Sequence, residues 1–135
     1  MIKKFIHGDK KTDQELFCLI GEWAVSEDVH ETLGTAITSR AGDVWHISIG
    51  SRGADGFAQT RIMKNKKAHI RYMFFSEKKT YSALLKEIED MAQKEEIESI
   101  FTNDREDAEI WKTAGFTKGE KPPRGSFCRW EKNLS

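Results

Sequence analysis

The sequence contains few of the residues that cross-link or interrupt a chain. Among its 135 residues are two cysteines and two prolines. Cys18 and Cys128 lie far apart and form no Cys-x-x-Cys pair, so the sequence offers neither a disulfide framework nor a zinc motif. We therefore expect no metal site, and a location in the reducing cytoplasm.

Long apolar runs and an excess of one charge are missing as well. No segment approaches the ~18 apolar residues of a membrane-spanning helix, and residues 1–7 contain no apolar signal-peptide core. Lys plus Arg and Asp plus Glu number 22 each, so no overall field attracts nucleic acid or an anionic membrane. The composition predicts no membrane insertion and gives no signal for nucleic-acid binding.

The residues that are present indicate a globular protein. Hydrophobic residues make up 38% of the chain and charged residues 33%, which is typical of a packed core with a charged surface. A chain of this length buries roughly two thirds of the surface that its unfolded form exposes. No repeat, linker or low-complexity run divides it, so we expect residues 1–135 to form a single domain.

The first third of the chain predicts one strand and two helices. Residues 2–6 read as a strand, and residues 12–24 follow with apolar side chains at helical spacing. Thr12 followed by Glu15 resembles a capping box. Residues 26–33 read as a shorter helix, with Ser26 as its cap and a glycine placed to end it.

The middle of the chain changes to a period of two. Residues 43–49, 57–63 and 68–75 alternate apolar and polar side chains and are joined by short turns, which predicts an antiparallel meander. In the first of these strands Trp45 lies on one face and His46 on the other. Because the faces are half polar, helices must cover at least one of them.

The last part predicts a crossover followed by a second set of short elements. Residues 80–93 form the clearest amphipathic helix, and residues 97–102 form a strand parallel to 68–75. A helix at 104–114 and two strands at 116–118 and 126–132 follow, with Pro122 and Pro123 in the connecting loop. The expected core residues are Phe57, Ile70, Leu84, Leu85, Ile88, Ile100 and Phe116. The fold class is α/β (α+β), with a mixed sheet of about six or seven strands between helices.

This order of elements is similar to that of the GNAT N-acetyltransferase superfamily over nearly the whole chain. Residues 55–58 (Asp-Gly-Phe-Ala) resemble the start of the family's third strand, and residues 82–86 resemble the start of its central helix. Residues 109–116 and 129–134 resemble its late helix and its final strand. The resemblance implies an enzyme that transfers an acetyl or other acyl group from acetyl-CoA, or another acyl-CoA, to an amine on a small molecule or a protein.

The segment before the central helix departs from the family pattern. In the family a glycine-rich loop cradles the diphosphate of acetyl-CoA with backbone N–H groups. Here residues 76–81 read Ser-Glu-Lys-Lys-Thr-Tyr, without glycine, and the segment is shorter than the usual loop by about four residues. Lysine side chains would then replace backbone donors. The residues that the resemblance assigns to acetyl-CoA are Phe74, Phe75, Lys78, Lys79, Thr80 and Tyr81.

The candidate catalytic residues are Glu77, His69 and Trp111. Trp111 occupies the place where the family often has a tyrosine that protonates the leaving thiolate, and an indole has no acidic proton to give. His69, like His46, lies on a predicted strand and is either a base or a half-buried, hydrogen-bonded side chain. Glu77 is either a base or an exposed turn residue. The carboxylates of 103–107 either attract a cationic acceptor or cap the following helix.

Three functions remain open at this point. The first is a GNAT-like N-acyltransferase. The second is a GNAT-like protein that has lost the usual CoA binding and acts as a binding module or uses another donor, which the missing glycines and Trp111 favour. The third is an interaction domain that forms a homodimer by exchanging its final strands.

Overall fold

The computed structural model describes residues 1–120, 125 and 127–134. The chain begins with β1 (Ile2–Ile6), α1 (Asp13–Ala24), α2 (Glu27–Leu33), β2 (Val44–Gly50), β3 (Gly53–Ile62) and β4 (Lys67–Phe75). It continues with α3 (Lys78–Lys94), β5 (Ser99–Arg105), α4 (Glu109–Thr113), β6 (Thr117–Lys118) and β7 (Phe127–Asn133). Pro122 and Pro123, placed in a loop by the sequence, lie outside the described residues, as does Ser126.

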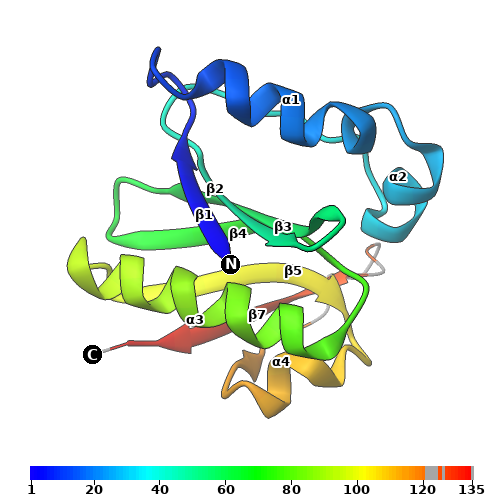
Figure 1. The fold of residues 1–135 in the computed structure, drawn as a ribbon. Coiled ribbons are helices and arrows are strands. Elements are labelled where there is room, and N and C mark those ends of the chain that lie inside the picture. The colour runs from blue at the N-terminus through cyan, green and yellow to red at the C-terminus, as the bar shows by residue number, and fades with distance from the viewer. Residues whose placement is uncertain (121–124, 126, 135) are drawn as a thin grey trace.

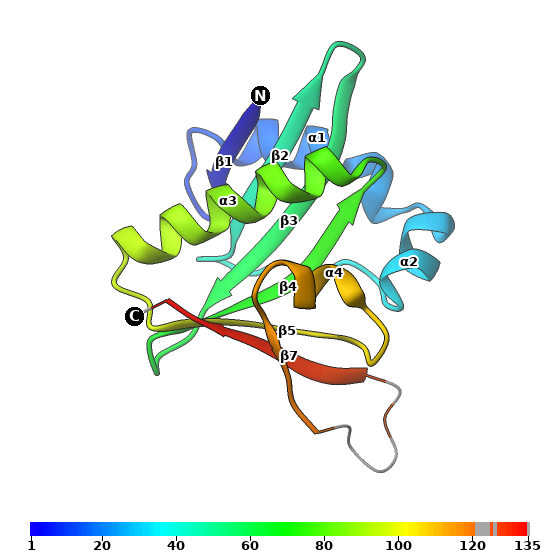
Figure 2. The ribbon, with the colours of Figure 1, turned by 90° about the horizontal axis from the view of Figure 1, so that it is seen from below.

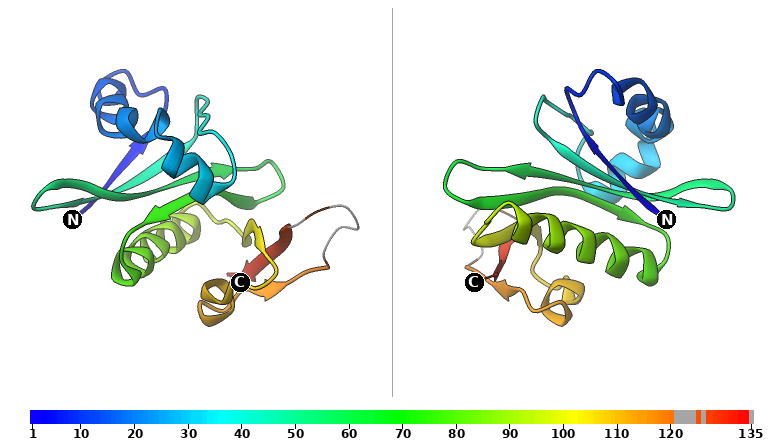
Figure 3. Two further views of the ribbon diagram at one scale, coloured as in Figure 1. Left: turned by 90° about the vertical axis from the view of Figure 1, so that its right-hand side faces the viewer. Right: turned by 60° about the vertical axis from the view of Figure 1, so that its left-hand side comes forward.

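The described strands form one seven-stranded sheet in the order β1-β2-β3-β4-β5-β7-β6. All neighbouring strands are antiparallel except β4 and β5, which are parallel, so the predicted mixed sheet is confirmed. Helices α1 and α2 lie on one face of the sheet, and α3 and α4 lie on the other (Figures 1 and 3). None of the helices in the described part of the chain is both long and apolar enough to span a bilayer.

Two hydrophobic clusters fill the spaces between these layers. One lies between the sheet and α3 with α4, and it includes Ile70, Ile88 and Trp111. The other lies between the sheet and α1 with α2, and it includes Trp45 and Phe57. All seven side chains predicted for the core are buried.

The predicted helix at 104–114 is wrong over its first half. Asn103, Asp104 and Arg105 instead continue β5 and pair with β7, and α4 covers only Glu109–Thr113. Pairing with β7 satisfies the backbone of these residues, which the local sequence pattern does not reveal. Of the carboxylates that the sequence placed at a helix start, Asp104 therefore lies on a strand, and Glu106 and Asp107 lie in the turn after it.

The ends of three other elements also differ from the sequence prediction. The side chain of Thr12 makes no capping hydrogen bond; Asp13 at the start of α1 accepts the backbone N–H of Gly8 at 3.0 Å instead. Helix α3 begins at Lys78 rather than at residue 80. Strand β3 begins at Gly53 rather than at residue 57, because its pairing with β2 continues past a bulge.

A bulge in β4 reverses the two faces of that strand. Tyr72 pairs with Gln59 and Ile70 pairs with Thr60, so Arg71 has no partner residue on β3. As a result Ile70 faces α3, while Tyr72, two residues later, packs into the cluster under α1 and α2. The simple alternation predicted for 68–75 is wrong beyond Ile70, because one extra residue shifts every later side chain to the opposite face.

The sheet opens between its two central strands. Strands β4 and β5 pair over three positions, from Lys67↔Ser99 to His69↔Phe101. One more link follows, because the Thr102 hydroxyl donates to the Ile70 carbonyl at 2.9 Å. Beyond it the strands diverge, β4 remaining with β3 and β5 with β7, and α4 lies over the resulting opening (Figure 2).

Candidate functional site

A cavity of about 310 Å³ lies where β4 and β5 diverge; we call it the opening cavity. Each element around the opening contributes to its wall. The lining residues are 31–34 at the end of α2, 71–73 of β4, 102–105 of β5, Trp111 of α4 and Phe127 of β7. The wall combines polar side chains such as Asn103 and Asp104 with apolar ones such as Leu33 and Phe127.

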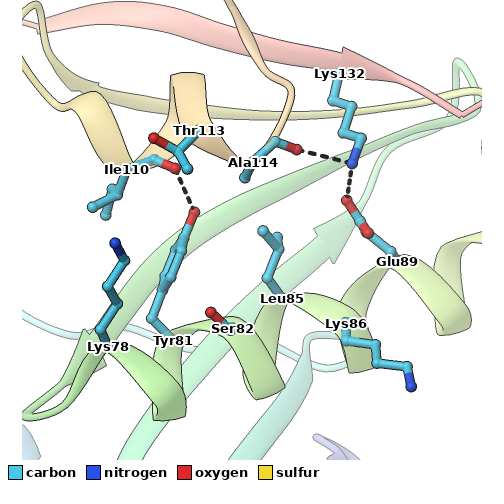
Figure 4. A pocket seen from close by; sticks show the side chains of 10 residues that line it. All are labelled: Lys78, Tyr81, Ser82, Leu85, Lys86, Glu89, Ile110, Thr113, Ala114 and Lys132. Atoms are coloured by element: carbon cyan, nitrogen blue, oxygen red, sulfur yellow. Dashed lines mark hydrogen bonds and ion pairs between the residues drawn. The ribbon is translucent and has the colours of Figure 1, made fainter.

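A second cavity of about 270 Å³ lies between α3 and α4; we call it the α3–α4 cleft (Figure 4). Lysines and apolar side chains share its wall. It is lined by Lys78, Tyr81, Ser82, Leu85, Lys86 and Glu89 of α3, by Ile110, Thr113 and Ala114 at α4, and by Lys132 of β7. The cleft therefore holds three of the chain's lysines against a single carboxylate.

Tyr81 and Trp111 stand between the two cavities. Tyr81 lines the α3–α4 cleft, Trp111 lines the opening cavity, and their rings meet edge to face at 5.7 Å. The Tyr81 hydroxyl donates to the Ile110 carbonyl at 3.0 Å, which ties α3 to α4 (Figure 4). Burial raises the pKa of Tyr81, with a smaller contribution from Glu89 and Asp104, so the hydroxyl stays protonated.

The opposite end of the cleft is held by Lys132. Its ammonium donates to Glu89 at 2.7 Å and to the Ala114 carbonyl at 2.9 Å (Figure 4). Lys78, Lys86 and Lys132 line the same cleft, but this contact neutralises Lys132. Lys78 and Lys86 have no ion pair among the residues that the structure describes.

The first turn of α3 separates the two lysines that the sequence proposed as phosphate partners. The Thr80 and Tyr81 N–H groups donate to the Glu77 carbonyl, while those of Lys78 and Lys79 find no acceptor among the described residues. The Lys78 side chain lines the cleft, whereas Lys79 is 83% exposed and pairs with Glu77 at 3.2 Å. Lys78 is thus the only one of the pair that faces the cleft.

The remaining residues assigned to acetyl-CoA are held by packing. Thr80 is buried against Gly56, where an added Cβ would lie 2.9 Å from both the Thr80 methyl and the Phe74 carbonyl. Phe74 stacks on Phe57, on the face that α1 and α2 cover. Phe75 packs on Tyr81, on the face that α3 covers. Close packing at Gly56 places the start of α3 directly on the sheet.

The three predicted catalytic side chains are not brought together. Trp111 lines the opening cavity, Glu77 lies at the start of α3, and His69 stacks on Phe101 at 4.5 Å in the last parallel pair. Neither Glu77 nor His69 lines either cavity. Burial lowers the pKa of His69 to about 4, helped by Arg71 and Arg129, so this imidazole is neutral at pH 7.

Trp111 uses its one polar hydrogen within the protein. Its indole Nε1–H donates to Asp104 Oδ2 at 2.7 Å, and the ring is 2% exposed. The other carboxylate oxygen of Asp104 accepts the backbone N–H of Arg105 at 2.7 Å. Sequence reasoning placed Asp104 in an acidic stretch but had no signal for its pairing with Trp111, seven residues further along the chain.

A polar network that the sequence did not reveal supports the far wall of the opening cavity. The Tyr72 hydroxyl accepts the Thr38 N–H at 3.2 Å and donates to the Ala36 carbonyl at 3.1 Å. Arg71, the bulged residue, donates to Gln59 at 2.6 Å and to Tyr72 at 3.1 Å. The bulge thus directs two consecutive polar side chains onto the loop after α2.

Asp43 anchors the other end of this loop. Both of its carboxylate oxygens accept from Arg61, at 2.7 and 2.8 Å, and Arg71 lies 3.6 Å away. Burial raises the pKa of Asp43, but the hydrogen bonds from Arg61 and from the Arg40 N–H outweigh it and lower that pKa overall. Asp43 therefore remains ionised and holds the loop to β3 and β4.

The described residues contain no cluster of three or more side chains that could hold a metal ion. No family model matches the sequence, and no curated protein matches it. Solved structures, by contrast, match along the whole chain. An acetyltransferase of the GNAT family from Staphylococcus aureus superposes with a TM-score of 0.66 at 13% identity, covering 100% of both chains.

The PaiA N-acetyltransferase of Thermoplasma acidophilum, solved with coenzyme A, gives a TM-score of 0.65 at 17% identity over 98% of both chains. The aminoglycoside 6'-N-acetyltransferase of Enterococcus faecium gives 0.66 at 10% identity, over 100% of this chain and 97% of that one. The chain has the GNAT fold. Identities this low establish the fold and leave the reaction to be argued from the site.

The structure locates the two places where the sequence was expected to depart from the GNAT pattern. The glycine-free segment becomes the tight first turn of α3, with Lys78 facing the cleft. Trp111, which the sequence resemblance aligned with the family's usual tyrosine, donates to Asp104. The first of these places lies at the α3–α4 cleft, and Trp111 lies in the wall of the opening cavity.

Proposed function

We propose that this chain is an N-acyltransferase that moves an acetyl or other acyl group from acyl-CoA to an amine. The main observation that supports this proposal is the pair of cavities on either side of Tyr81 and Trp111. One is lined by lysines along α3 and suits an anionic donor, and the other contains carboxylates at the opening of the sheet and suits a basic acceptor. The GNAT fold, and a neighbour of this fold solved with coenzyme A, support the proposal.

The residues of the α3–α4 cleft fit the phosphates of acyl-CoA. Lys78 faces the cleft, and the N–H groups of Lys78 and Lys79 have no intrahelical acceptor, so they would hold a diphosphate at the positive end of the α3 dipole. A volume of about 270 Å³ lies below the ~300–1,000 Å³ usual for small-molecule sites. The cleft would therefore accommodate part of acyl-CoA in this conformation.

Bound acyl-CoA would supply an acyl carbon activated as a thioester, which accepts the amine nitrogen and loses the thiol. The chain's own contribution is orientation rather than proton donation. Trp111 directs its N–H at Asp104 and offers no acid to a leaving thiolate. His69 and Glu77 remain proposed bases, although neither lines a cavity in this conformation.

A second candidate is a GNAT-fold protein that has lost CoA binding and serves as a binding module or uses another donor. The observation in its favour is the structure of the first turn of α3. The first turn of α3 has no glycine to let a diphosphate approach the backbone closely, and Tyr81 joins α3 to α4. Homodimer formation through the final strands remains a further proposal, to be checked by light scattering.

Calorimetric titration of acetyl-CoA and of free CoA into the purified protein separates the two candidates. We expect binding in the micromolar range. Lys78→Ala should weaken it by about 5- to 30-fold, because one charge-assisted contact to phosphate is lost, whereas Lys79→Ala should change it by less than about twofold. Added salt should weaken the wild type more than Lys78→Ala.

Lys79→Ala is the matched control, since it removes the same charge one residue further along the same turn. Equal loss in both variants would indicate general electrostatic attraction rather than contact with Lys78. If neither acetyl-CoA nor CoA binds, the acyltransferase proposal is wrong and the second candidate leads.

A further inference from the structure

The charged side chains around the opening cavity leave one negative charge uncompensated. Arg71 and Arg105 are the cations in its wall; Arg105 pairs with Asp107 at 3.4 Å, and Arg71 shares Asp43, 3.6 Å away, with Arg61. Three guanidinium groups therefore stand against four carboxylates when Glu31 and Asp104 are counted with Asp43 and Asp107. Glu31 and Asp104 are the anions in the wall, and neither has an ion pair among the residues described in the structure. The cavity therefore favours a cation.

Asp104 is the better placed of the two carboxylates. It lies on β5 beyond the last β4–β5 pair, and both oxygens are fixed, one by the buried Trp111 indole and the other by the Arg105 N–H, each at 2.7 Å. A carboxylate has about four lone-pair directions, so two remain for a ligand. Glu31 lies on the exposed surface of α2 and makes no side-chain hydrogen bond within the described residues.

We propose that Asp104 binds the protonated amine of the acceptor and that Trp111 is a positioning residue that holds this carboxylate toward the opening cavity. The inference rests on the proposed acyl transfer and names its acceptor class, aliphatic amines that carry a positive charge at neutral pH. A pre-oriented carboxylate forms a charge-assisted hydrogen bond with an ammonium group and none with an uncharged arylamine. Lysine side chains and polyamines have this chemistry, and anilines do not.

The proposal is tested by NMR without acyl-CoA, using butylamine as the cationic probe and aniline as the neutral one at pH 7. Two protons donate to Asp104 and report on it: the Trp111 indole Nε1–H, assigned by its loss in Trp111→Phe, and the Arg105 backbone N–H. Butylammonium should shift both resonances in a saturable manner. Aniline should move neither.

Asp104→Asn removes the charge and leaves an amide oxygen to accept from Trp111, so it tests charge without removing the contact. We expect the affinity of Asp104→Asn for butylammonium to fall by at least about tenfold. Glu31→Gln loses the same charge at the exposed rim, and its affinity should fall by less than about twofold. Trp111→Phe, followed at the Arg105 N–H, should weaken binding by about three- to tenfold, because the carboxylate is no longer held. In acyl transfer, the bound ammonium gives one proton to solvent before its nitrogen attacks the thioester carbon and the thiol leaves. Because Asp104 acts in binding and not in that attack, Asp104→Asn should raise KM for butylamine with little change in kcat.

Failure of this inference is distinct from failure of the proposed function. If acetyl-CoA binds but butylammonium leaves both resonances unmoved, or binds Asp104→Asn as well as the wild type, the role of Asp104 is refuted and acyl transfer stands. If butylammonium binds at Asp104 and acetyl-CoA does not bind, the ammonium site stands and acyl transfer is refuted. Equal affinity in Trp111→Phe and the wild type would remove the positioning role of Trp111.

Discussion

At the scale of single residues, His46 is the side chain whose burial has the clearest thermodynamic consequence. It lies in the centre of β2 with 1% of its surface exposed, and its Nδ1 has no hydrogen-bond partner among the described residues. Burial lowers its pKa from 6.5 to about 4, with a smaller contribution from Lys4 on the neighbouring strand. From the sequence, His46 was expected to be either a catalytic base or a hydrogen-bonded side chain. In the structure His46 lines neither cavity.

The folded protein should lose stability as His46 becomes protonated in the unfolded state. Because the folded pKa lies below the unfolded value of 6.5, this penalty is absent above that pH, grows as the pH falls toward 4, and is constant below. Between pH 7 and pH 5 it amounts to about 2 kcal/mol. Urea unfolding at both pH values should show that, between pH 7 and pH 5, the free energy of unfolding of His46→Leu falls by about 2 kcal/mol less than that of the wild type. An equal fall in both proteins would contradict the lowered pKa of His46.

At the scale of secondary-structure elements, the position of α4 relative to α3 sets the shape of the α3–α4 cleft. Helix α4 has five residues and is held to α3 by the Tyr81 hydroxyl and to β7 by Lys132. So short a helix has little stability of its own, because helix formation is cooperative and tertiary contacts supply most of it. Breaking one of these ties should therefore move α4 more easily than α3.

Tyr81→Phe tests this relation by removing the hydroxyl while keeping the ring against Trp111 and Phe75. We expect a loss of about 0.5–1.5 kcal/mol in the free energy of unfolding, which is the usual net value of one hydrogen bond. Amide hydrogen exchange in α4 should become faster, and exchange in α3 should not. Unchanged exchange throughout α4 would show that packing of Trp111, rather than the tie to Ile110, holds the helix.

At the scale of the whole molecule, the sheet consists of two halves that separate at the opening between β4 and β5. Strands β1–β4 and strands β5–β7 meet through three parallel pairs and the Thr102–Ile70 hydrogen bond. Thr102 is 5% exposed and Ile70 is 1% exposed, so water reaches this bond poorly. The bond is the last link before the opening cavity and sets how far the two halves remain together.

Thr102→Val should lower the free energy of unfolding by about 1–3 kcal/mol, because the buried Ile70 carbonyl loses its hydroxyl partner while the side-chain shape is kept. Thr102→Ser is the matched control, since it keeps the hydroxyl and removes only a methyl group. Denaturant unfolding of both variants measures the effect. Equal destabilisation in the two would assign the loss to packing and not to the hydrogen bond.

Most of the elements could be predicted from local pattern alone. The periodicity of residues 43–49, 68–75 and 80–93 depends only on which side chains face the core, and these elements formed within one or two residues of the predicted limits. The crossover between β4 and β5 follows from the handedness of a strand, helix and strand unit. The burial of Leu84 and Ile88 follows in the same way from the helix period.

The two cavities and their walls were decided by tertiary structure. The bulge at Arg71, the extension of β5 through Asp104 and the separation of Lys78 from Lys79 depend on partners distant in sequence, so no local pattern contains them. Trp111 and Asp104 meet only because β5 continues beyond the point where it leaves β4, and α4 lies over the resulting opening. By itself the sequence determined which faces are apolar and in what order the elements follow. Long-range backbone pairing then decided which polar groups meet, because unpaired strand edges and buried polar atoms must find partners across the sheet.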